Sequence, residues 1–249
     1  MPLYKTEAIV LLTYRVGEAD KIVVFLTRDQ GKLRGMAKGA RRPRSKFGGS
    51  LEVGTEVELR YFEKESRELV SVDRCDIIRS HFSYSGDPVR ACTLAYFTEL
   101  TDGFAQEKEP GEKLYRLLRV SMESLAEGDP EQVARYFEAW LLRLGGYYPR
   151  ADACKRCDAP LADRGAHYRA EDHSLRCPSC ASGGIVLSPE ALRYLKQVWQ
   201  NPPGAVEKPE SSVVFKELST LHRHMIVREL EKELRSQSVL DDLLRLSRT

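Results

Sequence analysis

The segment TEVELRYFE, residues 55–63, has the alternation that decides the fold of the first part of the chain. Val57, Leu59 and Tyr61 occupy every second position with charged residues between them, which is the period of a strand with one buried face. Four more stretches are rich in β-branched and apolar residues and have no helix between them. Five short strands in a row predict a small antiparallel barrel, and the OB-fold has that size. The other four expected strands are residues 7–14, 21–27, 32–38 and 69–78.

The hydrophobic period changes to that of helices after about residue 82. The clearest helix spans residues 130–144, with Asp129 as its N-cap and Pro130 in its first turn. Ser188 and Pro189 start another helix in the same way. We therefore predict an α+β protein with an OB-fold nucleic-acid-binding domain over residues 1–80 and an α-helical domain over residues 81–249. Further helices are expected over residues 89–104, 112–125, 189–200, 212–235 and 239–246, and the apolar face of the helix over 130–144 should hold Val133, Phe137, Trp140, Leu141 and Leu144.

Composition fits a globular protein of 249 residues, with 42% hydrophobic and 31% charged residues. No apolar run approaches the roughly 20 residues that span a bilayer. The N-terminal residues lack the basic and apolar segments of a secretory signal. We expect a cytoplasmic protein, in association with the nucleoid, whose cysteines are kept reduced.

Two C-x2-C pairs, Cys154 with Cys157 and Cys177 with Cys180, are separated by 19 residues. Tetrahedral Zn²⁺ takes four thiolates, and two such turns can supply them. We predict one structural zinc ion in an insertion at about residues 150–185, with no open coordination position for catalysis. Two disulfides would need an oxidising compartment, and a redox C-x-x-C would need a thioredoxin-like βαβ pattern.

Two histidines and two cysteines lie outside these pairs. His167 and His173 fall between the pairs and could replace a cysteine, but with four thiols present they are expected to face solvent. Cys75 and Cys92 are isolated in sequence, which favours small buried hydrophobic side chains.

The net charge is only +2, yet residues 28–46 hold eight basic residues against one acidic residue, Asp29. The period of a strand places Lys32, Arg34, Met36 and Lys38 on one sheet face, and a loop rich in arginine follows. Such a strip suits a sugar–phosphate backbone, with salt-sensitive binding that reads no base sequence. The predicted DNA-contacting residues are Lys32, Arg34, Lys38, Arg41, Arg42, Arg44 and Lys46.

Aromatic residues near this strip offer a second kind of contact. Phe47 or Phe62 could stack on bases, which tolerates any sequence. A place in the barrel core explains each ring at least as well. A solvated basic loop that binds nothing is the plain alternative for the strip itself, because clusters of charge are common.

Three motifs in the first half resemble bacterial RecO DNA-repair proteins: GEADKI at residues 17–22, GKLR at 31–34 and AKGARRPRSKFGG at 37–49. The cysteine set and LRSQSVL at residues 234–240 are also similar to that family, so the resemblance runs along nearly the whole chain. It implies an OB-fold, a helical domain with a zinc site, and a part in the RecF-type pathway of DNA repair.

The resemblance also implies an activity and partners. RecO proteins bind single- and double-stranded DNA, anneal complementary strands and, with RecR, help load RecA onto strands coated by single-stranded-DNA-binding protein. Arg135 is the position that matches a basic residue for the acidic tail of that coating protein, and a surface charge on the helix is the simpler interpretation. Annealing involves no bond chemistry, so no enzyme activity is expected.

Two other classes of function remain open at this point. One is a zinc-dependent nucleic-acid-processing enzyme such as a nuclease, because carboxylates distant in sequence can meet in space. The other is a zinc-stapled assembly protein whose basic loop contacts RNA or another protein. The chain has no phosphate-binding loop, dinucleotide fingerprint or H-E-x-x-H motif.

Overall fold

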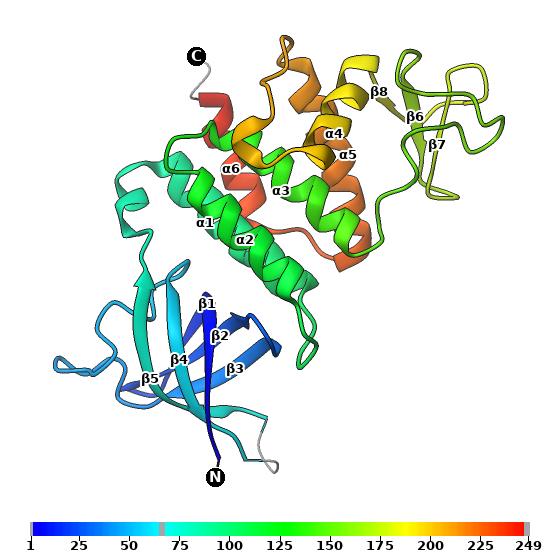
Figure 1. Cartoon of the computed structure of the whole chain (residues 1–249). Helices are drawn as coiled ribbons and strands as arrows, with labels where there is room; N and C mark the ends of the chain where they lie inside the picture. The colour runs from blue at the N-terminus through cyan, green and yellow to red at the C-terminus, as the bar shows by residue number, and fades with distance from the viewer. Residues whose placement is uncertain (1, 65–67, 247–249) are drawn as a thin grey trace. The chain divides into compact units, whose positions relative to one another are not determined.

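The computed structural model describes residues 2–64 and 68–246, and these form two compact units (Figure 1). The first, the barrel unit, contains Met1–Ala126 together with Leu234–Thr249. The second, the helical unit, contains Glu127–Glu233. The first compact unit is therefore larger than the predicted barrel segment, because it includes helices from both sides of the helical unit in sequence.

Five strands close into an OB-like barrel, which confirms the fold predicted for the first part of the chain (Figure 1). Neighbouring strands follow the order β1-β2-β3-β5-β4, and the pairing of β1 with β4 closes the barrel. All pairs are antiparallel except the short parallel contact of β3 with β5. The strands are β1 (Leu3–Val16), β2 (Asp20–Thr27), β3 (Gly31–Ala37), β4 (Glu56–Phe62) and β5 (Val70–Arg79).

The barrel core follows the alternation of the strands. Val57, Leu59 and Tyr61 of β4 are buried, as the pattern at residues 55–63 predicts. In β1 the register shifts between Val10 and Leu12, so one extra residue changes which side chains point inward beyond the bulge. Ile9, which lies next to the bulge and points out of the barrel, is nevertheless fully buried, because helices pack on that part of the outer wall.

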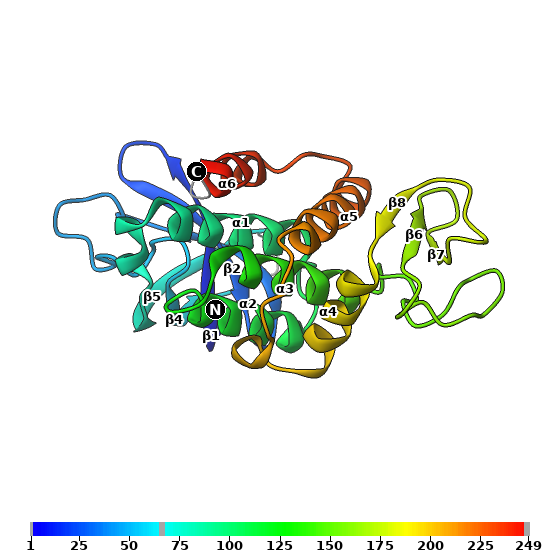
Figure 2. The ribbon, with the colours of Figure 1, turned by 90° about the horizontal axis from the view of Figure 1, so that it is seen from above.

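Four helical segments belong to the barrel unit. They are η1 (Phe82–Gly86), α1 (Pro88–Phe104), α2 (Glu112–Ser124) and α6 (Arg235–Leu246). The Asp87 side chain caps α1 by accepting from the backbone N–H groups of Val89 and Arg90. Helices α1 and α2 contact β1 and β2, and α6 runs beside α1 (Figure 2).

One helix expected over residues 212–235 ends earlier than predicted. The observed helix stops at Leu230, and Glu231 follows with a φ of +52°, outside the helical region. Helix α6 then begins at Arg235 rather than at Val239. The Glu99 carboxylate of α1 accepts from the backbone N–H of Ser236 at 3.0 Å, so a tertiary contact fixes where the last helix starts.

The helical unit holds three long helices and a small sheet. Asp129 Oδ1 accepts from the backbone N–H of Glu131 at 2.9 Å, which confirms the predicted N-cap of the helix over residues 130–144. Leu144 at its other end is 37% exposed, so the predicted apolar face ends one turn earlier. The elements are α3 (Pro130–Leu144), β6 (Ala166–Arg169), β7 (Ser174–Arg176), β8 (Ile185–Leu187), α4 (Pro189–Gln200), η2 (Pro203–Ala205) and α5 (Val213–Leu230).

Helix α3 is the centre of packing in this unit, because it contacts both α4 and α5. Trp140 of α3 donates from its indole N–H to the backbone oxygen of Val198 on α4 at 2.9 Å. The three short strands form a sheet in the order β7-β6-β8. Across the described ranges of both units, none of the helices combines the length and apolar composition of a membrane span.

Candidate nucleic-acid interface and metal centre

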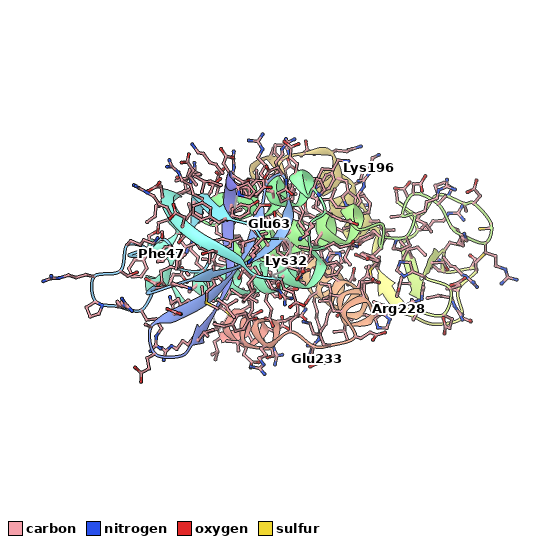
Figure 3. The ribbon with its side chains drawn as sticks, turned by 90° about the horizontal axis from the view of Figure 1, so that it is seen from below. Lys32, Phe47, Glu63, Lys196, Arg228 and Glu233 are labelled. Atoms are coloured by element: carbon pink, nitrogen blue, oxygen red, sulfur yellow. The ribbon has the colours of Figure 1, made fainter. Side chains whose placement is uncertain are left out.

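Strand β3 carries the basic residues on the outer wall of the barrel. Leu33 and Ala37 point into the barrel core and are buried. Lys32 and Arg34 alternate with them and point outward, as the period of the strand predicts, and the exposed Lys38 directly follows the strand. The strand and the loop that follows it, residues 38–46, here called the cationic loop, together hold all seven predicted DNA-contacting residues (in Figure 3, Lys32 lies on the strand and Phe47 directly follows the loop).

Three of these seven cations already have carboxylate partners. The Lys32 ammonium is 12% exposed, donates to the backbone oxygen of Asp102 at 2.7 Å and lies 3.5 Å from its carboxylate. Arg34 pairs with Glu107 at 3.1 Å, and Lys46 pairs with Asp73 at 3.6 Å. Lys32 therefore attaches β3 to the end of α1, and its charge is largely neutralised there.

The other four cations are exposed and have no carboxylate within 4 Å among the described residues. They are Lys38, Arg41, Arg42 and Arg44. The start of their loop is held to the β1–β2 turn. The backbone N–H of Arg41 donates to the oxygen of Ala19 at 2.9 Å, and that of Gly39 donates to Asp20 Oδ1 at 2.7 Å. The start of the loop is therefore held in place by hydrogen bonds, and its exposed side chains carry positive charge without carboxylate partners.

The structure decides between the two roles left open for Phe47. Phe47 is 3% exposed and belongs to the barrel core, so its suggested stacking role is wrong and the core interpretation holds. Phe62 is half-buried. The exposed rings of the barrel unit are Tyr4, Tyr14 and Phe82 at 41%, 52% and 72%. Sequence reasoning missed these rings because they lie outside the basic segment.

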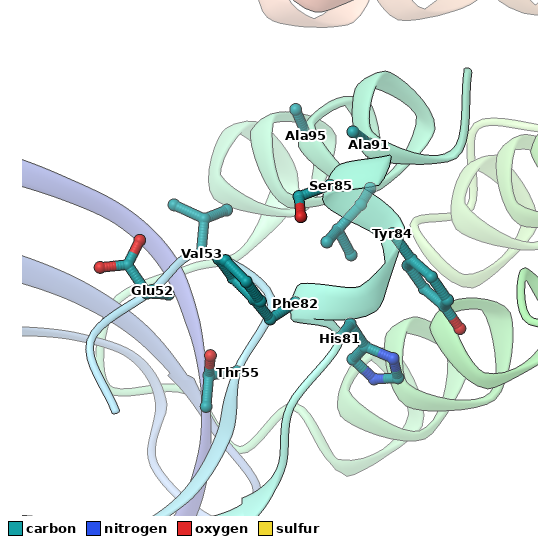
Figure 4. A pocket seen from close by; sticks show the side chains of 10 residues that line it. Glu52, Val53, Thr55, His81, Phe82, Tyr84, Ser85, Ala91 and Ala95 are labelled. Carbon is teal, nitrogen blue, oxygen red and sulfur yellow. The ribbon is translucent and has the colours of Figure 1, made fainter. Parts of the chain in front are cut away.

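A cavity of about 260 Å³ lies between residues 52–55, which precede β4, and the helical segments η1 and α1 (Figure 4). Its wall is mostly apolar, with Val53 and Leu94, and the exposed Phe82 ring stands at its edge. The charged side chain in its lining is Glu52, which would repel phosphate. Burial, and then the charge of Arg79, lowers the pKa of His81 in the same lining, so that imidazole is neutral near pH 7. The cavity is therefore poorly suited to bind the phosphates of a nucleic acid that lies on the cationic loop.

The four cysteines predicted as metal ligands come together in the helical unit. Their sulfur atoms all lie within 4.8 Å of one another, and the Sγ atoms of Cys157 and Cys177 are 3.8 Å apart. Each pair sits in a tight turn. The backbone N–H of Asp158 donates to the oxygen of Cys154, and that of Cys180 donates to the oxygen of Cys177, both at 2.9 Å. This group could hold a metal ion.

Hydrogen bonds within this cluster move the pKa values of two of its thiols in opposite directions. Burial raises the pKa of the Cys154 thiol, but backbone N–H donors at Cys177, Cys157 and Arg156 outweigh it and bring this pKa down to about 6. Hydrogen bonds to Cys157 and Cys177 raise the pKa of Cys180 to about 12. One thiol of the cluster therefore ionises more easily than a free cysteine and another less easily, because hydrogen bonds inside the cluster stabilise the ionised form of the first and the neutral form of the second.

The two histidines between the cysteine pairs are not part of the cluster within the described chain. His173 Nδ1 lies 2.8 Å from the Tyr168 hydroxyl, and its Nε2 contacts the backbone oxygen of Tyr147. His167 is half-buried on β6. The expectation that both face solvent is therefore wrong. Of the isolated cysteines, Cys75 is buried as expected and Cys92 is half-buried.

Arg135 lies inside the helical unit, so the surface position suggested for its charge is wrong. Its side chain is 2% exposed and pairs with the fully buried Glu138 at 3.0 Å. Glu138 also lies 2.9 Å from His222 Nδ1, and His222 Nε2 lies 3.2 Å from the Tyr148 hydroxyl. A carboxylate only accepts, so His222 donates from Nδ1 and accepts from Tyr148 at Nε2.

Burial is the main influence on the titration of His222. It lowers the pKa of this imidazole more than the neighbouring Glu138 raises it, so the ring is neutral near pH 7. The group then has one positive guanidinium, one carboxylate and a neutral ring. These buried groups have no access to a substrate. Their role is to stabilise the interior of the helical unit.

Comparison with protein families matches both parts of the chain. The family model described as "Recombination protein O N terminal" matches residues 1–81, which include the barrel. The model described as "Recombination protein O C terminal" matches residues 85–238, which include the four cysteines.

Full-length relatives support the same assignment. A protein named DNA repair protein RecO from Koribacter versatilis (strain Ellin345) is 33% identical over 246 residues, covering 97% of this chain and 99% of the relative. A protein of the same name from Syntrophus aciditrophicus (strain SB) is 32% identical over 251 residues, covering 98% and 97%. Another, from Anaeromyxobacter sp. (strain K), is 29% identical and covers 98% of both chains.

Proposed function

Because the chain belongs to the RecO family of DNA repair proteins, we propose that it is a non-enzymatic recombination mediator that binds single- and double-stranded DNA and anneals complementary strands. The observation that carries this proposal is the cationic loop. Lys38, Arg41, Arg42 and Arg44 are exposed there and have no carboxylate partner within the described residues.

Unpaired cations on a loop suit a phosphate backbone for a physical reason. Each ammonium or guanidinium that meets a phosphate releases a counterion from the nucleic acid, and the gain in entropy drives binding. Cations that neutralise two strands together reduce the repulsion between the strands, and base pairing then provides the energy of annealing. Residues 31–46 of the described chain contain a strand and a loop and no helix, so contacts should be made to the DNA backbone rather than to base edges.

A charge-matched comparison tests the loop. Replacing Arg41, Arg42 and Arg44 by alanine should weaken binding to all DNA sequences and flatten the slope of log affinity against log salt by about 3. The control replaces Arg164, Arg193 and Lys196, three exposed basic residues of the helical unit, and so removes the same charge. Fluorescence anisotropy with labelled oligonucleotides measures both. An equal loss in the two triple variants would contradict the assignment to the loop.

We propose that the cysteine cluster holds one structural zinc ion. In a regular tetrahedron with Zn–S bonds of about 2.3 Å the sulfurs lie about 3.8 Å apart. The Sγ atoms of Cys157 and Cys177 are 3.8 Å apart, which matches this value, and all four sulfurs lie within 4.8 Å of one another. Cys154, Cys157, Cys177 and Cys180 would fill all four positions, which leaves none for a substrate. The ion would supply folding energy to the β6–β8 region.

The family assignment extends the proposal to partners in the cytoplasm and nucleoid. We propose that the protein cooperates with RecR to load RecA onto strands coated by single-stranded-DNA-binding protein, in the RecF-type pathway. In this proposal Arg135, which is 2% exposed, acts on the coating protein's acidic tail only by fixing helix α3, since exposed neighbours must make the contact.

An annealing assay separates the proposed function from its alternatives. Complementary oligonucleotides, bare and coated, should pair faster with the protein than without it, and RecR should assist on coated strands. Labelled DNA incubated with the protein and Mg²⁺ should remain intact. Cleavage that follows the protein through purification would indicate a nuclease instead. Tighter binding to RNA than to single-stranded DNA would favour an RNA assembly factor.

A further inference from the structure

The outer wall of the barrel has an uncovered apolar row beside the cationic loop. Tyr14, Ile22 and Met36 are paired in register across β1, β2 and β3, so their side chains lie side by side on one face. Neighbouring strands are about 4.8 Å apart, so the row is about 10 Å across. Tyr14 is 52% exposed, and the other two are half-buried.

On strands β1, β2 and β3, the two rows that follow this one toward the helices are already occupied. The row with Ile9, Leu26 and Lys32 is covered by α1 and α2, and the two apolar side chains are fully buried. Between that row and the row of Tyr14, Arg34 is neutralised by Glu107. Uncovered apolar surface therefore begins at Tyr14, which makes no hydrogen bond or ring contact with any other residue in the described ranges.

Positive charge borders this row on the side of the loop. Lys38, which is exposed, is the first residue after β3 and follows Met36 by two residues, so it lies at the end of the strand that carries Met36. The loop is attached to the hairpin that carries Tyr14, because the Arg41 guanidinium donates to the backbone oxygen of Gly17 at 3.2 Å. The exposed carboxylate of that hairpin turn is Glu18. Asp20 of the same hairpin is half-buried and accepts from the Gly39 N–H, so four cations stand against two carboxylates and the border stays positive.

We propose that Tyr14, with Ile22 and Met36, is a stacking platform for an unpaired base of single-stranded DNA, whose phosphates lie on Lys38 and the cationic loop. This inference rests on the proposed DNA-binding function and specifies where the bases lie. An aromatic face next to a cationic track is the arrangement that single-strand-binding surfaces use, because every base offers a π-face. A duplex keeps its bases stacked inside, so it can use the loop and not the platform.

The test compares two exposed rings of the same unit. Tyr14→Ala should weaken binding of a labelled oligo-dT by roughly 5- to 150-fold, the usual value of one stacked base. Its affinity for a duplex and its salt slope should stay as in the wild type, because no charge is removed. Tyr14→Phe should bind nearly as tightly as the wild type. The matched control, Phe82→Ala, removes a ring at the Glu52-lined cavity and should bind normally.

Different failures point to different conclusions. If the wild type binds no DNA in dilute salt, the proposed function fails and the platform with it. If the wild type binds oligo-dT and Tyr14→Ala binds equally tightly, only the platform fails, and its apolar row belongs to another partner. Equal losses from Tyr14→Ala and Phe82→Ala would also overturn it. Photocrosslinking with 5-iodouracil DNA, followed by mass spectrometry, should place the adduct at Tyr14.

Discussion

The cationic loop and the surroundings of Glu138 both gather charged groups, but they treat those groups in opposite ways. In the loop, Arg41, Arg42 and Arg44 are exposed and have no carboxylate partner among the described residues. In the helical unit, Arg135 and Glu138 are 2% and 0% exposed and pair with each other at 3.0 Å. The charges of the loop are therefore free to bind an anion, whereas those of the buried pair neutralise each other.

The difference follows from solvation. A buried ion loses the stabilisation of water, so it persists only with a partner and with its remaining hydrogen-bonding atoms satisfied. An exposed arginine keeps its water and its counterions, and it exchanges them for phosphate at little cost. The loop therefore suits binding, and the buried pair suits the internal structure of one unit. This contrast predicts which substitutions should lower the stability of the protein and which should lower only its affinity for DNA.

The largest effect should come from the metal centre of the helical unit. Replacing Cys154 and Cys177 by serine should abolish metal binding and unfold the β6–β8 region, because structural zinc provides about 10–16 kcal/mol of apparent binding energy in comparable sites. Native mass spectrometry should show one zinc ion in the wild type and none in the variant. Cys92→Ser is the matched control, since Cys92 lies in the barrel unit. A folded and metal-free double variant would contradict the structural role.

The second-largest loss of stability should come from breaking the buried ion pair of Arg135 and Glu138. Glu138→Ala leaves Arg135 and His222 without their carboxylate and should lower the free energy of unfolding by about 3–5 kcal/mol. The two tryptophans, Trp140 and Trp199, both belong to the helical unit, so their fluorescence in urea reports on that unit.

An exposed ion pair provides the control for that substitution. Lys208→Ala breaks the contact with Asp129, in which Lys208 is 61% exposed, and should cost less than about 1 kcal/mol. Similar costs for Glu138→Ala and Lys208→Ala would remove the contrast between buried and exposed charge.

The pH dependence of the helical unit should reveal His222. Burial lowers its pKa in the folded protein, so below about pH 6.5 the unfolded chain binds a proton that the folded chain does not. Stability should therefore fall as the pH falls through that value, by at most about 1.4 kcal/mol per pH unit. Urea unfolding between about pH 7.5 and about pH 5.5 measures this slope.

Histidine variants assign the slope to one residue. His222→Gln should remove this part of the pH dependence, whatever it does to stability at neutral pH. His224→Gln should keep it, because His224 is exposed on the same helix. A slope that survives His222→Gln and disappears in His224→Gln would reverse the assignment.

The smallest effect on stability should come from the cationic loop. Alanine at Arg41, Arg42 and Arg44 should change the free energy of unfolding by about 0.5 kcal/mol or less, since the three side chains are exposed and the hydrogen bond from Arg41 to Gly17 lies at the surface. The same variant should lose most of its DNA affinity. Thermal unfolding and anisotropy on one preparation make the comparison. A large loss of stability would mean that the loop serves the barrel and not a ligand.

The elements of the chain were largely predictable, because their signals are local. The alternation at residues 55–63 and the Asp129 cap each depend on neighbours within a few positions. The same holds for the two C-x2-C turns, whose spacing requires only that four sulfurs converge. Where a boundary depended on a distant contact, prediction failed. Helix α6 starts at Arg235, where the Glu99 carboxylate accepts from backbone N–H groups.

The sequence by itself determined which residues are basic, which cysteines converge and which segments form strands, because composition and period carry that information. Only the tertiary structure decided how each charge and ring is used. It paired Lys32 with Asp102, buried Arg135 beside Glu138, enclosed Phe47 in the core and left Tyr14 exposed. Burial and pairing depend on side chains far apart in sequence, and solvation energy distinguishes a buried charge from an exposed one.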